Sequence, residues 1–392
     1  MLFHMNTSWT VLCMLLALQV LAAGFLLLVT APPGPVSVAS GPGTTQSTIQ
    51  FLPAAQVSND IGLFSTSQKK VQITLGKPQT ANFVLQNNSL CFSTGTEPVR
   101  TITSPTNGCV CRKGWHGRDC GQPEVVWRAL ARHRPPLPPP TRRMQPRRLI
   151  CVIEAGPSME LIEMAAQEVS SVAELIILRG EHKLRSGWCR SWCSRTLQVT
   201  AGFDWTQLVA DLQPDDLISS WGKSTGFIPN AGALLFLKLY DGLPTPVLFR
   251  ARWTVYGFFW MHPRHTLSAT GAWLFANGRE QPLNRGENFV ELGDLNHYGG
   301  WVCVPCGTPS EIVSTLPLLT NHVGHENLQL PPHVDTHTVE DAMGAGVWLD
   351  GKTELLKTRM GDHEFAPASA LTEVQLYDLL FKNYYDRVGL DY

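Results

Sequence analysis

Two adjacent carboxylates in a turn are the residues of this chain best suited to chemistry. Asp215 and Asp216 follow a proline, and a loop rich in Gly, Ser and Thr, residues 219–226, comes next. The apolar segment Ala231–Tyr240 has the spacing of a helix that stops at Asp241 and the glycine after it. Because α/β enzymes usually carry reactive groups on loops between strands and helices, this turn is a candidate active site. The alternative is a solvated turn, the commonest role of such sequences.

The segments around this turn predict an α/β fold. In chain order they are the strand Leu149–Ile153, the helix Met159–Val172, the strands Glu174–Leu178, Val247–Trp253 and Val255–Trp260, and a closing amphipathic helix, Leu371–Tyr385. The β-α-β order at the start suggests an open sheet of the kind that binds nucleotides. Residues 154–157, after the first strand, are not a glycine-rich phosphate-binding sequence, so a nucleotide must be held in another way.

The composition limits the classes of function. The chain has 392 residues, enough for one large domain or two, and its net charge is −1. Charged residues make up 16% of the chain, below the roughly 25% usual in soluble domains. No excess of basic residues marks a nucleic-acid surface, so nucleic acid is not an expected partner.

Most of the ten cysteines lie in closely spaced groups, namely Cys109, Cys111 and Cys120, then Cys189 and Cys193, then Cys303 and Cys306. Such spacing indicates disulfides in an oxidising compartment and metal sites in the cytosol. The N-terminal sequence therefore decides between the two readings.

The first 90 residues read as a short cytosolic tail (1–10), a transmembrane anchor (11–30) and an extended stem (31–90). The apolar run in the anchor nearly spans a hydrocarbon core of ~30 Å. A cleaved signal peptide is the alternative, although its apolar region is typically only ~7–15 residues. The stem is rich in Pro, Gly, Ser, Thr and Gln, and Asn87 in it is a glycosylation sequon. With cysteine-rich segments downstream, the C-terminal part is expected in the lumen, where disulfides form.

A small cysteine module is expected at residues 91–121. Its sequence CVCRKGWHGRDC, which ends at Cys120, resembles the second half of an EGF-like domain. Four cysteines allow three pairings, and the resemblance favours Cys111 with Cys120, which leaves Cys91 with Cys109. Residues 122–148 read as a stiff linker rich in Pro and Arg, and residues 149–392 as the main domain.

Several blocks occur in a fixed order along the chain: CVCRKGWHGRDCG, LQPDD, LLFLKLYDG, YGFFW and HYGGWVCVPC, the last from His297 to Cys306. The blocks GVWLDG and DHEFAP match more loosely. Together they resemble glycosyltransferase family 17, the bisecting N-acetylglucosaminyltransferases, from about Cys91 to Tyr385. This chain is identified as a divergent member of that family.

The resemblance implies a single-pass type II Golgi membrane protein with a lumenal, nucleotide-sugar-binding α/β domain. It implies transfer of N-acetylglucosamine from UDP-N-acetylglucosamine, in β-1,4 linkage, to the core mannose of N-glycans on glycoproteins, usually with Mn²⁺. It also makes a disulfide between Cys303 and Cys306 more plausible than a zinc site. The transfer needs a carboxylate as general base, and Asp215 and Asp216, which match the family, are the catalytic candidates. Asp241 also matches and is a substrate-binding candidate, with a turn-forming role as the alternative.

One departure from the family bears on the metal. In the family an acidic run of the type D-D-x-D-E-x-P follows Pro-Asp-Asp and suits a divalent cation. The corresponding segment here, Ser219–Pro229, contains no carboxylate and carries Lys223. The metal ligands are therefore unknown, and Lys223 is a candidate to contact the donor diphosphate directly. The alternative function is a catalytically inactive relative that binds glycan or a transferase and modulates it.

Overall fold

The structure is a computed structural model, and only part of the chain is described. The described residues are 73–78, 83–86, 88–98, 108–154, 158–180, 195–200, 203–221, 226–277, 289–322 and 333–386, with backbone alone at 269–270 and 318–322. The predicted anchor at 11–30, the sequon at Asn87 and the loop residue Lys223 lie outside these ranges. Within them, every helix is too short or too polar to cross a membrane.

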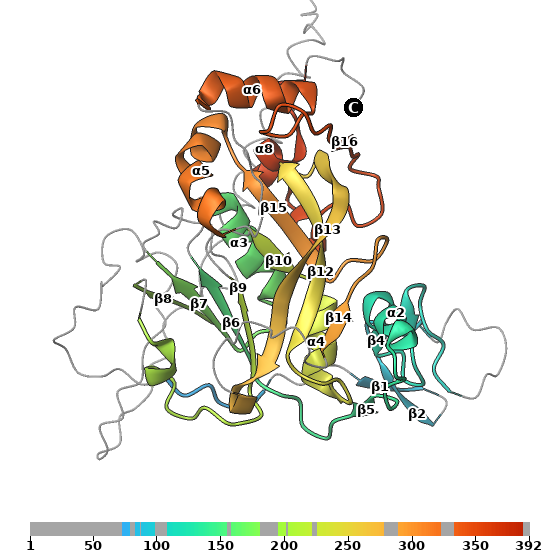
Figure 1. The fold of residues 1–392 in the computed structure, drawn as a ribbon. Helices are drawn as coiled ribbons and strands as arrows, with labels where there is room; N and C mark the ends of the chain where they lie inside the picture. The colour runs from blue at the N-terminus through green and yellow to red at the C-terminus, as the bar shows by residue number, and fades with distance from the viewer. Residues whose placement is uncertain are drawn as a thin grey trace, which may run out of the picture. The chain divides into compact units, whose positions relative to one another are not determined.

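A mixed sheet is the main element of the described chain, with strands in the order β10-β15-β12-β13-β9-β6-β7-β8 (Figure 1). Their bounds are β6 Leu149–Glu154, β7 Leu175–Arg179, β8 Thr196–Val199, β9 Leu217–Trp221, β10 Phe227–Pro229, β12 Val247–Tyr256, β13 Trp260–Leu274 and β15 Gly300–Cys306. Two short strands join the sheet, β14 (Val290–Leu292) beside β12 and β16 (Leu356–Lys357) beside β13.

The strands β8, β7, β6 and β9 run parallel, and β13 is antiparallel to both of its neighbours, β9 and β12. Side chains of β6 alternate between two hydrophobic clusters. Leu149 and Cys151 point into one cluster, whereas Ile150 and Val152 point into the other. Burial on both faces explains why this strand reads as a continuous apolar run in the sequence. The predicted α/β class is confirmed.

The helices are α2 Glu124–Arg132, α3 Met159–Val169, α4 Ala231–Leu239, α5 Pro309–His322, α6 Thr336–Ala345, α7 Ala368–Leu371 and α8 Asp378–Phe381, with 3-10 turns η4 Trp205–Gln207, η5 Phe275–Asn277 and η6 Val374–Tyr377. Helices α3 and α4 are among those that start at polar caps. The Ser158 hydroxyl accepts a hydrogen bond from Leu161 N at 3.4 Å, and Asn230 Oδ1 accepts one from Ala233 N at 3.1 Å. These caps fix where α3 and α4 begin.

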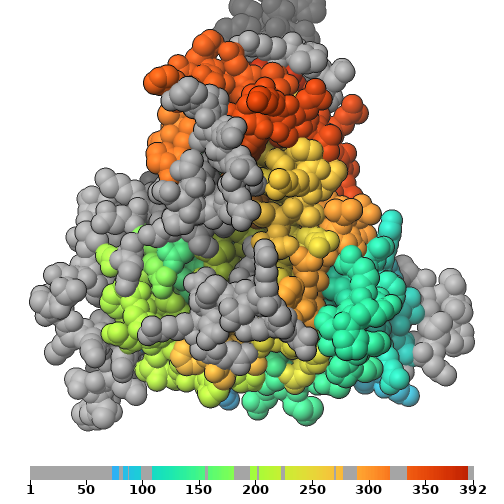
Figure 2. Space-filling view, in the orientation of Figure 1, coloured from blue at the N-terminus to red at the C-terminus, as the bar shows by residue number. Residues whose placement is uncertain are grey.

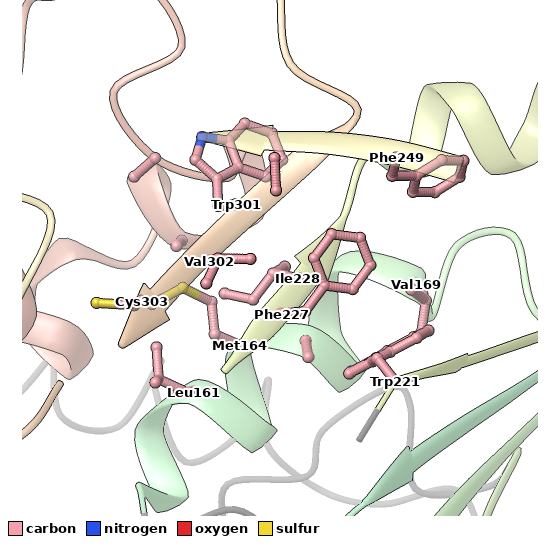
Figure 3. Close-up of a cluster of buried hydrophobic side chains, with 14 of the residues drawn as sticks. Leu161, Met164, Val169, Trp221, Phe227, Ile228, Phe249, Trp301, Val302 and Cys303 are labelled. Atoms are coloured by element: carbon pink, nitrogen blue, oxygen red, sulfur yellow. The ribbon is translucent and has the colours of Figure 1, made fainter. Parts of the chain in front are cut away.

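The larger hydrophobic cluster joins α3 to the sheet. In Figure 3, Leu161 and Met164 of α3 lie beside Ile228 of β10 and Val302 of β15. Phe227 lies between these residues and Trp221. The rings of Trp221 and Phe227 meet edge to face at 5.9 Å. The packing therefore ties β10 and β15 to the carboxyl end of β9.

Residues 83–123 form what we call the cysteine module. Its hairpins are β1 Phe83–Gln86 with β2 Ser89–Phe92, and β3 Trp115–His116 with β4 Gln122–Pro123. The disulfides are Cys91–Cys109 and Cys111–Cys120, the pairing that the EGF-like resemblance favours. Strand β1 lies inside the segment 31–90 that was expected to be stem, so the ordered module begins before residue 91.

Residues 122–148, expected to be a linker, contain folded elements as well. Val125, Val126 and Ala129 of α2 are buried in the main hydrophobic cluster. Figure 2 shows the teal surface of α2 against the orange surface near β14, and the two elements are in contact. Strand β5, Thr141–Arg142, pairs with β11, Tyr240–Asp241, just after α4. This segment is therefore part of the domain that follows it.

Three sequence predictions of secondary structure are wrong. Residues 219–226 were expected to be a loop, but the first three of them belong to β9. Val247–Trp253 and Val255–Trp260 are not separate strands, because β12 continues through a register shift between Arg252 and Thr254 and turns only after Tyr256. The closing helix is broken into η6 and α8, with Leu376, Leu379 and Tyr384 exposed. Tyr377 is buried, and its hydroxyl donates to Gln167 Oε1 of α3 at 2.7 Å. This tertiary contact fixes the local backbone, and the helical spacing of the sequence does not.

Candidate functional site

The chain reverses its direction across the sheet between β6 and β9. From β6 it proceeds to β7 and β8, and it then returns to place β9 on the other side of β6. In open α/β sheets, ligands bind beyond the carboxyl ends of the strands at such a switch point. Here those ends are Glu154 of β6 and Trp221 of β9, with Ile153 paired to Trp221. The candidate ligand site lies beyond these ends, where residues 155–157 and 222–225 follow in the sequence.

A charged pair from two neighbouring strands lies at this edge. Glu154 of β6 is in register with Arg179 of β7, and Arg179 Nη1 donates a hydrogen bond to Glu154 Oε1. The Arg179 Nε is buried and has no hydrogen-bond partner among the described residues. The Glu154 side chain is 9% exposed, and the Arg179 side chain is 24% exposed. A guanidinium has five N–H donors, so Arg179 retains donors for a ligand beside the carboxylate it already binds.

The backbone just before β10 is tightly packed at Gly226. Gly226 has a φ of +48°, and a Cβ there would lie 2.5 Å from the carbonyl oxygen of Cys303. Both observations require glycine at this position. The indole Nε1 of Trp221 is buried without a partner in the described part of the chain. The switch-point edge therefore carries two buried donors, one on Arg179 and one on Trp221, that have no partner among the described residues.

The predicted catalytic residue Asp216 lies at the opposite edge of the sheet, since it precedes β9. It is 2% exposed, and Arg148, just before β6, donates to it from Nε at 2.7 Å and from Nη2 at 2.6 Å. Gln213 N donates to the same carboxylate at 2.7 Å. The hydrogen bond to Asp216 raises the pKa of Arg148 above its ordinary value. These contacts join the amino ends of β6 and β9, which is a structural role for Asp216.

The structure brings two other predicted site residues together, Asp215 and Asp241. Both bind Arg143 and Arg147, with Arg147 Nε 3.1 Å from Asp215 Oδ1 and Arg143 Nη1 2.6 Å from Asp241 Oδ1. Partial burial of Asp241 opposes its ionisation, but the hydrogen bonds and charges of the two arginines hold its pKa below the ordinary value. Both carboxylates are about half exposed. Their catalytic and substrate-binding roles stay predictions, and Asp215, which precedes β9, lies at the end of that strand away from the switch-point edge.

The cysteine pair at the end of β15 is a disulfide, Cys303–Cys306. Cys189 and Cys193 are outside the described residues. Across the part of the chain that the structure describes, no group of three or more His, Cys, Asp or Glu side chains is arranged to hold a metal ion.

The side chains at the switch point do not fit Mn²⁺, which takes oxygen ligands and above all carboxylates. Ser219–Pro229 contain no carboxylate, and the Ser219 hydroxyl donates to the carbonyl oxygen of Gly271. Glu154 is the carboxylate described at the carboxyl ends of β6, β7 and β9, and Arg179 already binds it. Among the described residues, this edge therefore has no donor set of the family type.

Glu154 and Arg179 were not among the predicted site residues. The predicted strands Leu149–Ile153 and Glu174–Leu178 each stop one residue short of them. The signal that could have found them is their place as the last residues of two neighbouring parallel strands, the position that sheet topology assigns to ligand-binding groups.

Comparison with known proteins supports the family resemblance. No family model and no solved structure matches the chain. The β-1,4-mannosyl-glycoprotein 4-β-N-acetylglucosaminyltransferases of Rattus norvegicus, Mus musculus and Homo sapiens are each 25% identical to it, over 71% of this chain. The chain is a distant relative of these transferases. The resemblance recognised from the sequence blocks is thus confirmed as that of a divergent relative. The match spans 62% of the length of each of these relatives.

Proposed function

We propose that the chain is a glycosyltransferase that binds UDP-N-acetylglucosamine at the switch point between β6 and β9. It transfers N-acetylglucosamine in β-1,4 linkage to the core mannose of N-glycans on glycoproteins. In this proposal it is a single-pass type II protein of the Golgi membrane, with the described residues in the lumen. The disulfides of the cysteine module and of β15 support an oxidising compartment.

The position of the switch point carries the proposal. The segment that replaces the acidic run of the family begins inside β9 and continues past its carboxyl end. In an open sheet this is where a nucleotide is expected. Lys223 follows β9 by two residues, and we propose that its ammonium contacts the donor diphosphate directly. Mn²⁺, expected from the family, has no fitting ligand set among the residues described at this edge.

The acceptor hydroxyl needs a carboxylate to take its proton. Asp215 and Asp216 are the family-matched candidates, but both lie at the amino end of β9. Glu154 lies at the switch-point edge, where we propose that the nucleotide sugar binds, and it is therefore tested beside them. In the transfer assay described next, the variants Asp215→Asn, Asp216→Asn and Glu154→Gln identify which carboxylate the reaction requires, and circular dichroism under the assay conditions shows whether each variant is folded.

The test is transfer from UDP-N-acetylglucosamine to a biantennary N-glycan, with product measured by mass spectrometry, with and without Mn²⁺. An active relative serves as the positive control. We expect product, and we expect Lys223→Ala to weaken donor binding in the same preparation. Unchanged donor binding in that variant would remove Lys223 from the site.

A second candidate function is a catalytically inactive relative that binds glycan or a transferase. The observation in its favour is the absence of carboxylates from Ser219–Pro229. Metal stabilisation of the leaving group is worth several kcal/mol, and each ~1.4 kcal/mol is a tenfold change in rate. Glycan binding without any product, beside an active relative, would favour this second function.

A further inference from the structure

We infer that Glu364 is the catalytic base of the proposed transfer and that its carboxylate takes the proton of the acceptor hydroxyl. This role rests on the proposed function, in which a carboxylate must perform that step. The acceptor oxygen forms a bond to the anomeric carbon of N-acetylglucosamine. The bond from that carbon to the diphosphate breaks and its electron pair stays on UDP, while the hydroxyl proton passes to Glu364.

The carbonyl oxygen of Glu364 is held by two buried side chains of the sheet. Arg252 of β12 donates to it from Nη1 at 2.8 Å, and Trp301 of β15 donates to it from Nε1 at 3.0 Å. Arg252 and Trp301 are paired in register, so they lie on the same face of the sheet. Figure 3 shows Trp301 on the side of β15 away from Leu161 of α3. Two rigid strands therefore set the position of Glu364, as a site for chemistry requires.

The backbone of Glu364 is in the left-handed region, with a φ of +51°. This conformation is uncommon for a residue with a side chain and persists only where the surrounding structure enforces it. The hydrogen bonds to the Glu364 carbonyl enforce it here, together with one from Arg252 Nη1 to the carbonyl oxygen of His363 at 3.1 Å. A turn alone would be made with less strain by glycine. The conformation therefore points to a use for the glutamate side chain.

One oxygen of the Glu364 carboxylate is held and the other is available. Oε2 accepts a hydrogen bond from Tyr298 N at 2.6 Å. Glu364 is partly exposed, and its Oε1 is not fully buried and accepts no hydrogen bond from a described residue. A fixed carboxylate with one open oxygen suits proton transfer from a hydroxyl at hydrogen-bond distance.

The surroundings of the carboxylate increase its basicity. Burial is the largest effect, and it raises the pKa of Glu364 above the ordinary value of 4.5. The hydrogen bond from Tyr298 N and the charges of His363 and Arg252 lower the pKa, and the charge of Asp294 raises it. A general base is most effective when its pKa lies near the working pH, so the net rise favours this role.

Two imidazoles beside the carboxylate suit a sugar as the acceptor. His363, which precedes Glu364, is exposed, and its ring centre lies 5.1 Å from that of His297. The His297 Nδ1 faces Asp294 Oδ1 at 3.4 Å. Imidazoles both donate and accept hydrogen bonds. They are therefore suited to bind the other hydroxyls of the acceptor sugar.

Packed residues connect Glu364 with the end of β9, where we propose that the donor binds. Trp221 ends β9, and its ring meets that of Phe227 of β10 at 5.9 Å. Phe227 is paired with Val302 of β15, the residue after Trp301, which binds the Glu364 carbonyl. The donor edge and Glu364 are therefore joined through the adjacent strands β10 and β15.

The experiment compares transfer from UDP-N-acetylglucosamine to a biantennary N-glycan by the wild-type full chain and by Glu364→Gln. The amide oxygen of the variant can still accept from Tyr298 N, but the amide cannot take a proton. We expect kcat to fall about 100-fold or more, while the Kd of UDP changes by less than about two-fold. Glu364→Asp moves the carboxylate back by one methylene and should lower kcat about 10-fold or more. Circular dichroism shows whether each variant is folded.

The pH profile is a readout that a purely structural role would not change. Glu364 acts in its ionised form, so the wild-type kcat should fall as the pH drops through the raised pKa, above pH 4.5. The residual activity of Glu364→Gln should lack this fall. Glu291→Gln is the matched control, because Glu291 of β14 is a partly exposed carboxylate whose Oε2 lies 2.6 Å from Arg250 Nη2. Its kcat and pH profile should stay those of wild type.

A folded Glu364→Gln variant with the wild-type kcat would overturn the assignment of Glu364 and leave the proposed function intact. A wild-type kcat that stays constant down to pH 4.5 would overturn it as well. If Glu364→Gln does not fold, an unchanged kcat in folded Glu364→Asp has the same meaning. If the wild-type chain gives no product beside an active relative, the proposed function itself fails, and the role of Glu364 fails with it.

Discussion

Arg148 holds the carboxylate of Asp216 with two hydrogen bonds, Nε to Oδ1 at 2.7 Å and Nη2 to Oδ2 at 2.6 Å. Both side chains are buried, and Arg148 also binds Asp211 through Nη1 at 2.5 Å. Arg148 precedes β6 and Asp216 precedes β9, so the pair fixes the start of the two strands that frame the switch point. Removing one partner would leave the other charge buried and uncompensated.

The first prediction concerns this pair. Asp216→Asn should lower the free energy of unfolding by about 3 kcal/mol or more, the cost of breaking a buried ion pair on one side. Urea denaturation measures the change. Asp215→Asn is the control, because Asp215 is about half exposed and its loss should cost less than about 1 kcal/mol. A folded Asp216→Asn variant of wild-type stability that has lost transfer activity would instead support the catalytic role.

The second prediction concerns the contact of the cysteine module with α4. Tyr240, at the end of α4, donates from its hydroxyl to Asp119 Oδ2 of the module at 2.8 Å. A Cβ on Gly121 would lie only 1.7 Å from that hydroxyl oxygen. Gly121→Ala should therefore displace the Tyr240 side chain and lower the free energy of unfolding by about 1–3 kcal/mol.

Two variants sharpen this test. Gly361→Ala is the matched control, because nothing lies within 4 Å of a Cβ at that position, and its stability should stay near wild type. Tyr240→Phe removes the clashing oxygen, so Gly121→Ala should cost less in that background. Additive losses in the double variant would show that Tyr240 is not the group that Gly121 accommodates.

The third prediction is a pH dependence of stability. Glu168 of α3 is buried, and burial raises the pKa of its carboxyl above the ordinary value of 4.5, although Ser369 of α7 donates to it from N at 3.3 Å and from Oγ. Between pH 4.5 and the raised folded-state pKa, folding takes up a proton. The contribution of this group to the free energy of unfolding thus falls with rising pH, by at most about 1.4 kcal/mol per pH unit.

Glu168→Gln cannot titrate and lacks this fall. Relative to wild type, the variant should gain stability as pH rises above 4.5, and urea denaturation at a series of pH values measures the difference. A difference between the two proteins that is constant with pH would contradict the prediction. Ser369→Ala tests the partner, because without the hydroxyl donor the carboxyl pKa should rise further.

The sequence predicted two of the four parallel strands, β6 and β7, for a physical reason. Leu149–Glu154 and Leu175–Arg179 are buried on both faces, so each is an uninterrupted apolar run with short polar boundaries. Helix α4 was equally clear, because Asn230 caps its start and its apolar spacing is continuous. Local sequence determines these elements.

The site was harder to predict because its chemistry depends on distant partners. Asp216 reads as a reactive carboxylate until Arg148, far away in the sequence, is seen to bind it. Glu154 and Arg179 became candidates only when strand order showed that β6 is where the chain reverses. The sequence blocks identified the family resemblance. The edge of the sheet at which each carboxylate lies could be determined only from the fold.

The arginines that precede β6 have a practical consequence for shortening the protein. A fragment that starts at Leu149 omits Arg143, Arg147 and Arg148, and so leaves Asp215, Asp216 and Asp241 without their counter-ions. It also lacks Asp119 of the cysteine module, which accepts a hydrogen bond from the Tyr240 hydroxyl. The smallest fragment expected to express in soluble form therefore starts upstream of Phe83, because residues that precede the sheet in sequence form ion pairs and hydrogen bonds with it.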